Sequence, residues 1–77
     1  TQADEPLALA SVLERRAELA QGADRAGLLV RSGRAFEAAG EGADAIRVTR
    51  SAASAQPGPE VFEQLARLHA VGNEPAR

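Results

Sequence analysis

Glycine and proline recur along this chain at intervals that leave room for four helices. The residues concerned are Pro6, Gly22, Gly40, Gly42, Pro57, Gly58, Pro59 and Gly72. These residue types are the strongest interrupters of regular structure, so they divide the 77 residues into four segments. Within the segments, apolar residues recur at spacings of three and four, which is the period of an amphipathic helix. The sequence therefore predicts an all-α fold of about four helices, over residues 5–21, 26–39, 43–55 and 60–71.

The apolar residues available for a core are mostly small. They make up 44% of the chain, but alanine supplies much of that share, and Phe36 and Phe62 are the only aromatic residues. Alanine favours helices because it loses no side-chain entropy there, yet it adds little apolar area to a core. This composition suits thin helices that pack close together, and it argues against a β-sandwich or a barrel.

Capping residues stand near the ends of the first two expected helices. Asp4 and Asp24 can each accept a hydrogen bond from the free amides of a first helical turn. Gly22 follows the first helix as a C-terminal cap. The largely apolar face of that helix is expected to comprise Leu9, Val12, Leu13, Arg16, Leu19 and Ala20.

The third and fourth helices have less uniform patterns. Ile46, Val48 and Thr49 favour strands, so a strand over residues 46–50 is an alternative to the third helix. Pro57 ends this segment because the residue before a proline disfavours the helical conformation. The inner face of the third helix is expected to comprise Ala45, Ile46, Thr49, Ala52 and Ala53, and the fourth helix keeps helical spacing at Val61, Phe62, Leu65, Leu68 and His69.

The second helix has a glycine in the middle of its apolar stripe. Leu29, Gly33 and Phe36 share this stripe, which ends at Gly40. A glycine inside a helix costs about 1 kcal/mol relative to alanine. We therefore expect another helix to pass close to Gly33.

Small and large residues follow one another at fixed offsets between residues 29 and 57. The positions are Leu29, Gly33, Phe36, Gly40, Ala45, Ala52 and Pro57. This pattern resembles the tetratricopeptide-repeat family, whose repeat is a helix pair with these residue types at these offsets. The resemblance implies that Gly33 and Ala45 let the two backbones approach. Thr49 and Ser32 depart from the pattern, because the family usually has a large aromatic residue and a leucine there.

The same resemblance extends to the flanking helices and implies a stack of repeats. Ala10 and Ala17 repeat the spacing of Ala45 and Ala52, so the first helix resembles the second half of a preceding repeat. The fourth helix resembles the first half of a following repeat through Phe62, Leu65, Ala66 and His69. The expected architecture is antiparallel helix pairs in a right-handed superhelical stack. Residues 1–77 would form a single domain of this type, as a piece of a longer array.

The resemblance also implies a scaffold that binds other proteins. In the family, the first helix of each repeat lines a concave groove that holds a partner peptide or helix. Val30, Arg34 and Glu37 match groove-lining positions, and Arg67 lies on the fourth helix as a further candidate. Arginine at such a position can grip a carboxylate with two hydrogen bonds; the alternative is a solvated helix face. The carboxylate-clamp subclass uses lysine and asparagine where Val30 and Arg34 stand, so the chain is not assigned to it.

Residues that carry chemistry are sparse in this chain. It has no cysteine and no lysine, which excludes thiol catalysis, disulfides and a P-loop lysine. His69 is the only histidine and is interpreted as a packing or groove residue, and residues 40–42 as a turn between helices. Two pairs of acids are interpreted as solvated surface: Glu14 with Glu18, and Glu60 with Glu63. We therefore expect no enzyme, and no catalytic, cofactor or metal site.

Charge and hydropathy narrow the expected partners. Nine basic residues stand against eleven acidic ones, for a net charge of -2, and nucleic-acid binders usually have a basic excess. No apolar run approaches the roughly 20 residues of a membrane span. We expect a protein or peptide partner, no nucleic acid and no membrane, and self-association through exposed terminal helices. Arginine without lysine, with much alanine and glycine, is typical of a GC-rich bacterial genome; the compartment stays open, with the cytoplasm slightly favoured.

Two other interpretations remain open. One is a closed helical bundle that serves as a docking or dimerisation element of a larger multi-domain protein. A closed bundle requires contact between the first and fourth helices, whereas a repeat stack forbids it. The other is a helix-turn-helix DNA-binding protein that would use Arg31, Arg34, Arg47 and Arg50.

Overall fold

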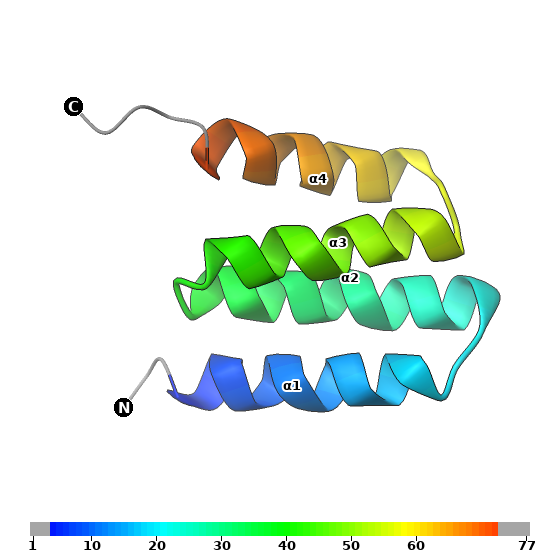
Figure 1. Ribbon diagram of the computed structural model, residues 1–77, viewed down its shortest axis with the longest axis horizontal. Helices are drawn as coiled ribbons and strands as arrows, with labels where there is room; N and C mark the ends of the chain where they lie inside the picture. The colour runs from blue at the N-terminus through cyan, green and yellow to red at the C-terminus, as the bar shows by residue number, and fades with distance from the viewer. Residues whose placement is uncertain (1–3, 73–77) are drawn as a thin grey trace.

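The computed structural model describes residues 4–72, which form four α-helices joined by short turns (Figure 1). The helices are α1 (Asp4–Glu18), α2 (Gly22–Ala38), α3 (Gly42–Ala55) and α4 (Pro59–Gly72). No strand occurs in this part of the chain, so the predicted all-α fold is confirmed. The alternative of a strand over residues 46–50 is wrong, because these residues lie inside α3.

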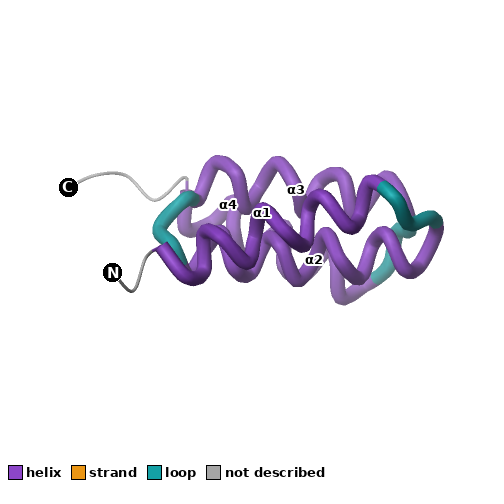
Figure 2. Tube along the Cα trace, turned by 90° about the horizontal axis from the view of Figure 1, so that it is seen from below, coloured by secondary structure: helices purple, strands orange, loops and turns teal. Residues whose placement is uncertain are grey.

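The helices form a flat, open row. Each packs mainly on its neighbours in the chain, and α1 and α4 lie at opposite edges with α2 and α3 between them (Figure 1). Seen from the α1 edge, the helices run along a common direction (Figure 2). Across the helices, the molecule measures 30 Å in one direction and 14 Å in the other. A closed four-helix bundle has two similar widths, since its axes stand about 8–10 Å apart both ways, so the packing differs from that of a closed bundle.

The helices α2 and α3 approach each other closely at Gly33. A Cβ atom added to Gly33 would lie 2.5 Å from Thr49 Oγ1, 3.0 Å from Gln64 Nε2 and 3.4 Å from the Ala45 carbonyl oxygen. The expectation that a helix passes close to Gly33 is therefore confirmed. The buried apolar residues of the described chain are Ala10, Leu13, Ala17, Ala26, Leu29, Val30, Ala35, Phe36, Ala45, Val48, Ala52, Val61 and Leu68.

A buried hydroxyl joins α2 to α1. Ser32 is fully buried, and its Oγ donates a hydrogen bond of 2.8 Å to the Ala10 carbonyl oxygen. A leucine at this position would need more room than the contact leaves. Because the bond lies in the interior, it fixes how far α1 can slide along α2.

The first helix ends earlier than predicted, at Glu18 rather than at residue 21. The backbone amides of Leu19 and Ala20 donate to carbonyls three residues back, which tightens the last turn. Gly22 therefore does not cap α1, and this prediction is wrong. It opens α2 with a φ of +60°, in the left-handed region that glycine adopts without steric cost.

The second helix begins earlier than predicted, at Gly22 rather than at residue 26. Asp24 is therefore not its N-cap, which is a further correction. It lies inside the first turn, and Gln21 occupies the cap position without a side-chain hydrogen bond to the backbone. Asp24 there places a negative charge near the positive end of the helix dipole. The side chain of Asp4, the other predicted cap, lies outside the described residues.

Gly40 makes the turn between α2 and α3, as predicted. Its φ is +81°. Its amide donates to the Glu37 carbonyl oxygen at 3.0 Å, and the Glu41 amide donates to the Phe36 carbonyl oxygen at 2.8 Å. These two bonds form a Schellman motif, which satisfies carbonyls at the end of the helix. The chain thereby reverses direction within a few residues.

Only part of each apolar face expected from the sequence on α1, α3 and α4 is buried. On α1, Leu13 is buried as expected, but Leu9 is 51% exposed, Val12 53% and Leu19 88%. The small residues Ala10 and Ala17 lie against α2 instead, because they allow a closer approach. On α3, Val48 is buried, while Ile46 and Ala53 are only half-buried. On α4, Phe62 and His69 are exposed, and the buried residues are Val61, Gln64 and Leu68.

The crossing at Gly33 predicts a cost for any side chain there. We expect Gly33→Ala to lower the free energy of unfolding by about 1–2 kcal/mol, because overpacking a core costs about 1–3 kcal/mol and alanine returns about 1 kcal/mol of helix propensity. Urea unfolding followed by circular dichroism measures this difference.

Gly27 provides the matched control for this substitution. It lies in the same helix, and no atom lies within 4 Å of where its Cβ would be. Gly27→Ala should raise the free energy of unfolding by up to about 1 kcal/mol. Equal effects of the two substitutions would show that the helices do not approach as described.

Candidate functional site

Polar side chains from α2 and α4 meet on one face of the row. Arg34 Nε donates a hydrogen bond of 2.9 Å to Gln64 Oε1. The Arg67 guanidinium binds the Glu37 carboxylate with two hydrogen bonds, of which Nη2 to Oε1 measures 2.9 Å. Both contacts join helices that are not neighbours in the chain. They bring α2 and α4 together on this face.

Gln64 connects this cluster to the core. Its side chain is buried, with 4% of the residue exposed. Its Nε2 donates to Thr49 Oγ1 at 3.1 Å and to the Val30 carbonyl oxygen at 3.2 Å, while its Oε1 accepts from Arg34. The amide therefore has all its main hydrogen-bonding groups engaged, as a buried amide requires. It links three helices at one point.

A shallow pocket of about 270 Å³ opens above this anchor. It is lined by Arg34, Glu60, Glu63, Gln64 and Arg67. Two guanidinium groups and two carboxylates can form hydrogen bonds with a polar or charged segment of a partner. Among residues 4–72, no group of three or more histidines, cysteines or acids is arranged to hold a metal ion.

The cluster shifts the titration of its ion pair. The hydrogen bond from Arg67 lowers the pKa of the Glu37 carboxyl, and the charges of Arg67 and Arg34 act in the same direction against the opposing effect of burial. Glu37 in turn raises the pKa of Arg67. The pair stays ionised at neutral pH. It is half open to solvent, with 50% of the Arg67 side chain and 33% of the Glu37 side chain exposed.

The structure brings together three of the four residues predicted to bind a partner. Arg34, Glu37 and Arg67 share the α2–α4 face. Val30 does not, because only 5% of the residue is exposed. Its carbonyl oxygen is already bound by Gln64. The placement of Val30 on the groove surface is therefore corrected.

Sequence reasoning missed Gln64 altogether. A signal for it exists: Gln64 stands between Val61 and Leu68 at helical spacing, on the stripe that is buried in α4. A polar residue on such a stripe needs a hydrogen-bonding partner in the core. Glu60 and Glu63, interpreted as solvated surface, are exposed and line the pocket.

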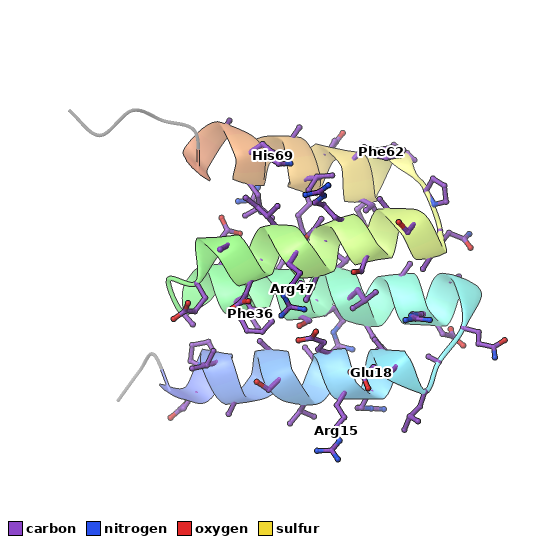
Figure 3. The ribbon with its side chains drawn as sticks, in the orientation of Figure 1. Arg15, Glu18, Phe36, Arg47, Phe62 and His69 are labelled. Atoms are coloured by element: carbon purple, nitrogen blue, oxygen red, sulfur yellow. The ribbon has the colours of Figure 1, made fainter. Side chains whose placement is uncertain are left out.

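A second polar contact joins α1 and α3. Arg47 Nη1 donates to Glu14 Oε2 at 2.6 Å, and its Nε donates to Asp44 Oδ1 at 3.3 Å. The guanidinium carbon stands 5.9 Å from the centre of the Phe36 ring (Figure 3). Glu14, and then Asp44, raise the pKa of Arg47. Arg47, one of the four arginines that the DNA-binding interpretation would use, is therefore already bound by two acids.

No protein-family model, curated protein or solved structure matches this chain. Within residues 4–72, no helix is long and apolar enough to cross a membrane. Function is therefore inferred from the chain's own residues and geometry.

The anchoring role of Gln64 predicts a stability effect larger than that of a surface glutamine. Gln64→Ala should lower the free energy of unfolding by about 1–3 kcal/mol, because it removes two buried hydrogen bonds and side-chain packing. Gln56→Ala is the control, since Gln56 is exposed at the end of α3. Urea unfolding of both variants compares them; similar midpoints would contradict the anchor.

The Glu37–Arg67 pair predicts a pH effect with a definite sign. Because the pKa of Glu37 is lowered in the folded state, the pair stabilises the fold above the ordinary glutamate value of about 4.3. That stabilisation is lost as the pH falls from there through the folded-state pKa. Arg67→Ala should raise the pKa of Glu37 in an NMR titration of its side-chain carboxyl, whereas Arg15→Ala on α1 should leave it unchanged. A pKa unmoved by Arg67→Ala would exclude the pair in solution.

Proposed function

We propose that this chain is a non-catalytic protein–protein interaction module of the tetratricopeptide-repeat type, which binds a partner peptide or helix on the α2–α4 face. The packing order supports a repeat stack, since each helix packs mainly on its neighbours in the chain. Side chains of α2 meet α4, and those of α1 meet α3. Alternate helices thus share a face, as expected when the same helix pair repeats along a row.

One observation carries the proposed binding face: Arg34 and Arg67, from different helices, line the same pocket. The Arg34 guanidinium has five N–H donors, and its bond to Gln64 uses one of them. Glu60 and Glu63 on the pocket rim supply acceptors. A partner segment with both acidic and basic or amide side chains matches this mixture of charges.

The competing functions have less support. A docking or dimerisation element built as a closed bundle would need α1 packed on α4, and these helices lie at opposite edges. DNA binding would need a positive face, but Glu37, Glu60 and Glu63 accompany Arg34 and Arg67. Phosphate groups would be repelled by these carboxylates.

Peptide display against the whole chain tests the proposed function. Peptides selected for binding are measured against the wild-type chain and against the double variant R34E/R67E. We expect the double variant to bind them roughly tenfold or more weakly, because charge-assisted hydrogen bonds to two guanidinium groups are lost. Isothermal titration calorimetry gives the affinities.

The variant R15E/R50E is the control with the same change in charge. Both residues are exposed, and Arg15 projects from the outer edge of α1 (Figure 3). It should bind the selected peptides as the wild type does. Equal losses of peptide affinity in both double variants would show that net charge alone causes the effect. No loss of affinity in R34E/R67E would show that the peptides bind on another face.

A further inference from the structure

The last helix exposes the positions that α2 buries. In α2, Leu29, Gly33 and Phe36 form a buried stripe, and Gly33 on it faces Thr49 and Ala45 of α3. The residues at the same spacing in α4 are Phe62, Ala66 and His69, and all three are exposed. Phe62 is 52% exposed, which is unusual for one of two aromatic residues in the chain. The face of α4 that corresponds to the α3-binding face of α2 therefore has no helix on it within the described residues.

The opposite edge of the row has a groove between α1 and α2. It consists of two adjoining pockets of about 570 Å³ and 390 Å³, which share Arg31. Apolar side chains that line it include Leu9, Leu13, Leu19 and Leu28. Leu9 and Leu19 are 51% and 88% exposed. The groove follows the α1–α2 pair, so its shape suits a helix.

We propose that α4 of one copy of this chain lies in the α1–α2 groove of a second copy. There α4 would pack against α1 and α2 of the other copy. This is the arrangement in which α2 packs against α3 and α4 within one copy. Phe62 would enter the larger pocket, beside Leu19 and Leu28. The α4 of one copy and the α1 of the other would then form one helix pair across two chains.

Charge favours this arrangement and sets its direction. The pair would be antiparallel, like α2 and α3, so the first turn of α4 meets the last turn of α1. Glu60 is the acid of that first turn, and Arg15 and Arg16 are the basic residues of that last turn. Arg16 and Arg31 line the larger pocket. Opposite charges therefore face each other across the proposed interface, which favours this register over the reversed one.

The two surfaces that meet are different, so the contact is head-to-tail. Such a contact leaves one groove and one α4 face unused in every dimer. Further copies add at both ends. A single helix-pair interface is small, and we expect association at roughly 10 µM to 1 mM rather than at nanomolar concentration. The α2–α4 pocket that would bind a peptide shares one lining residue with this groove, Arg34.

Two variants, each with one surface blocked, test the proposal. Leu9→Lys places a positive charge in the groove beside Arg31 and Arg34. Phe62→Lys places one on the exposed face of α4, which would meet Arg16 and Arg31 of the other copy. Both sites are half exposed, and circular dichroism verifies that the helices remain. Sedimentation velocity measures the mass of each chain over a range of concentrations. We expect the wild-type mass to rise beyond a dimer with concentration, while each variant alone stays monomeric because the buried lysine would face the arginines of the groove.

The mixture of the two variants gives the decisive result. Leu9→Lys keeps its α4 face and Phe62→Lys keeps its groove, so an equimolar mixture should form a one-to-one dimer and nothing larger. Ser54→Lys, on the exposed surface of α3, is the control and should associate as the wild type does. A monomeric wild type, a single variant that dimerises alone, or a mixture that stays monomeric would each overturn the proposal.

Discussion

The close approach of α2 and α3 at Gly33 is the constraint on which the rest of this structure depends. With no Cβ at Gly33, the Thr49 hydroxyl and the Gln64 amide come close to the α2 backbone. Gln64 belongs to α4, so one crossing positions three helices. The face that carries Arg34 then follows, because Gln64 Oε1 holds the Arg34 guanidinium. In a chain with so few large apolar residues, packing of backbones replaces packing of large side chains.

Ser32 and Thr49, which depart from the pattern that the sequence resembles, each make a buried hydrogen bond in this arrangement. Ser32 donates to α1, and Thr49 accepts from α4. Each small polar side chain fits a space that a larger residue would overfill. Buried hydrogen bonds of this kind are directional, so they select one register between helices. Hydrogen bonds at the α1–α2 and α3–α4 interfaces thus set the helix register that bulky side chains would otherwise set.

The helices and their number could be predicted because glycine and proline mark their ends and because apolar residues recur at a helical period. Gly33 and Gly40 could be interpreted individually, since only a close approach or a left-handed turn requires glycine there. The buried faces of α1 and α4 could not, because a wide apolar stripe on an edge helix has only one neighbour to pack on. Periodicity gives the width of such a stripe but not its direction, so it left open which side chains of α1 and α4 are buried. At the candidate site, Arg34 and Glu37 were proposed from their offsets along a helix and Arg67 from its place on the fourth helix. The buried bond from Gln64 to the Val30 carbonyl oxygen could not be predicted, because it joins helices far apart in the sequence.

The central claim is that the four helices form an open row with α1 and α4 at opposite edges. The chain has no cysteine, so spin labels at Arg15→Cys and His69→Cys report one pair of sites, on α1 and α4 (Figure 3). Double electron–electron resonance, with excess unlabelled chain to dilute contacts between copies, measures their separation. An open row predicts a single distribution near the 30 Å breadth of the molecule. A closed bundle would set neighbouring axes about 8–10 Å apart, and a distribution well below the breadth of the row would contradict the account.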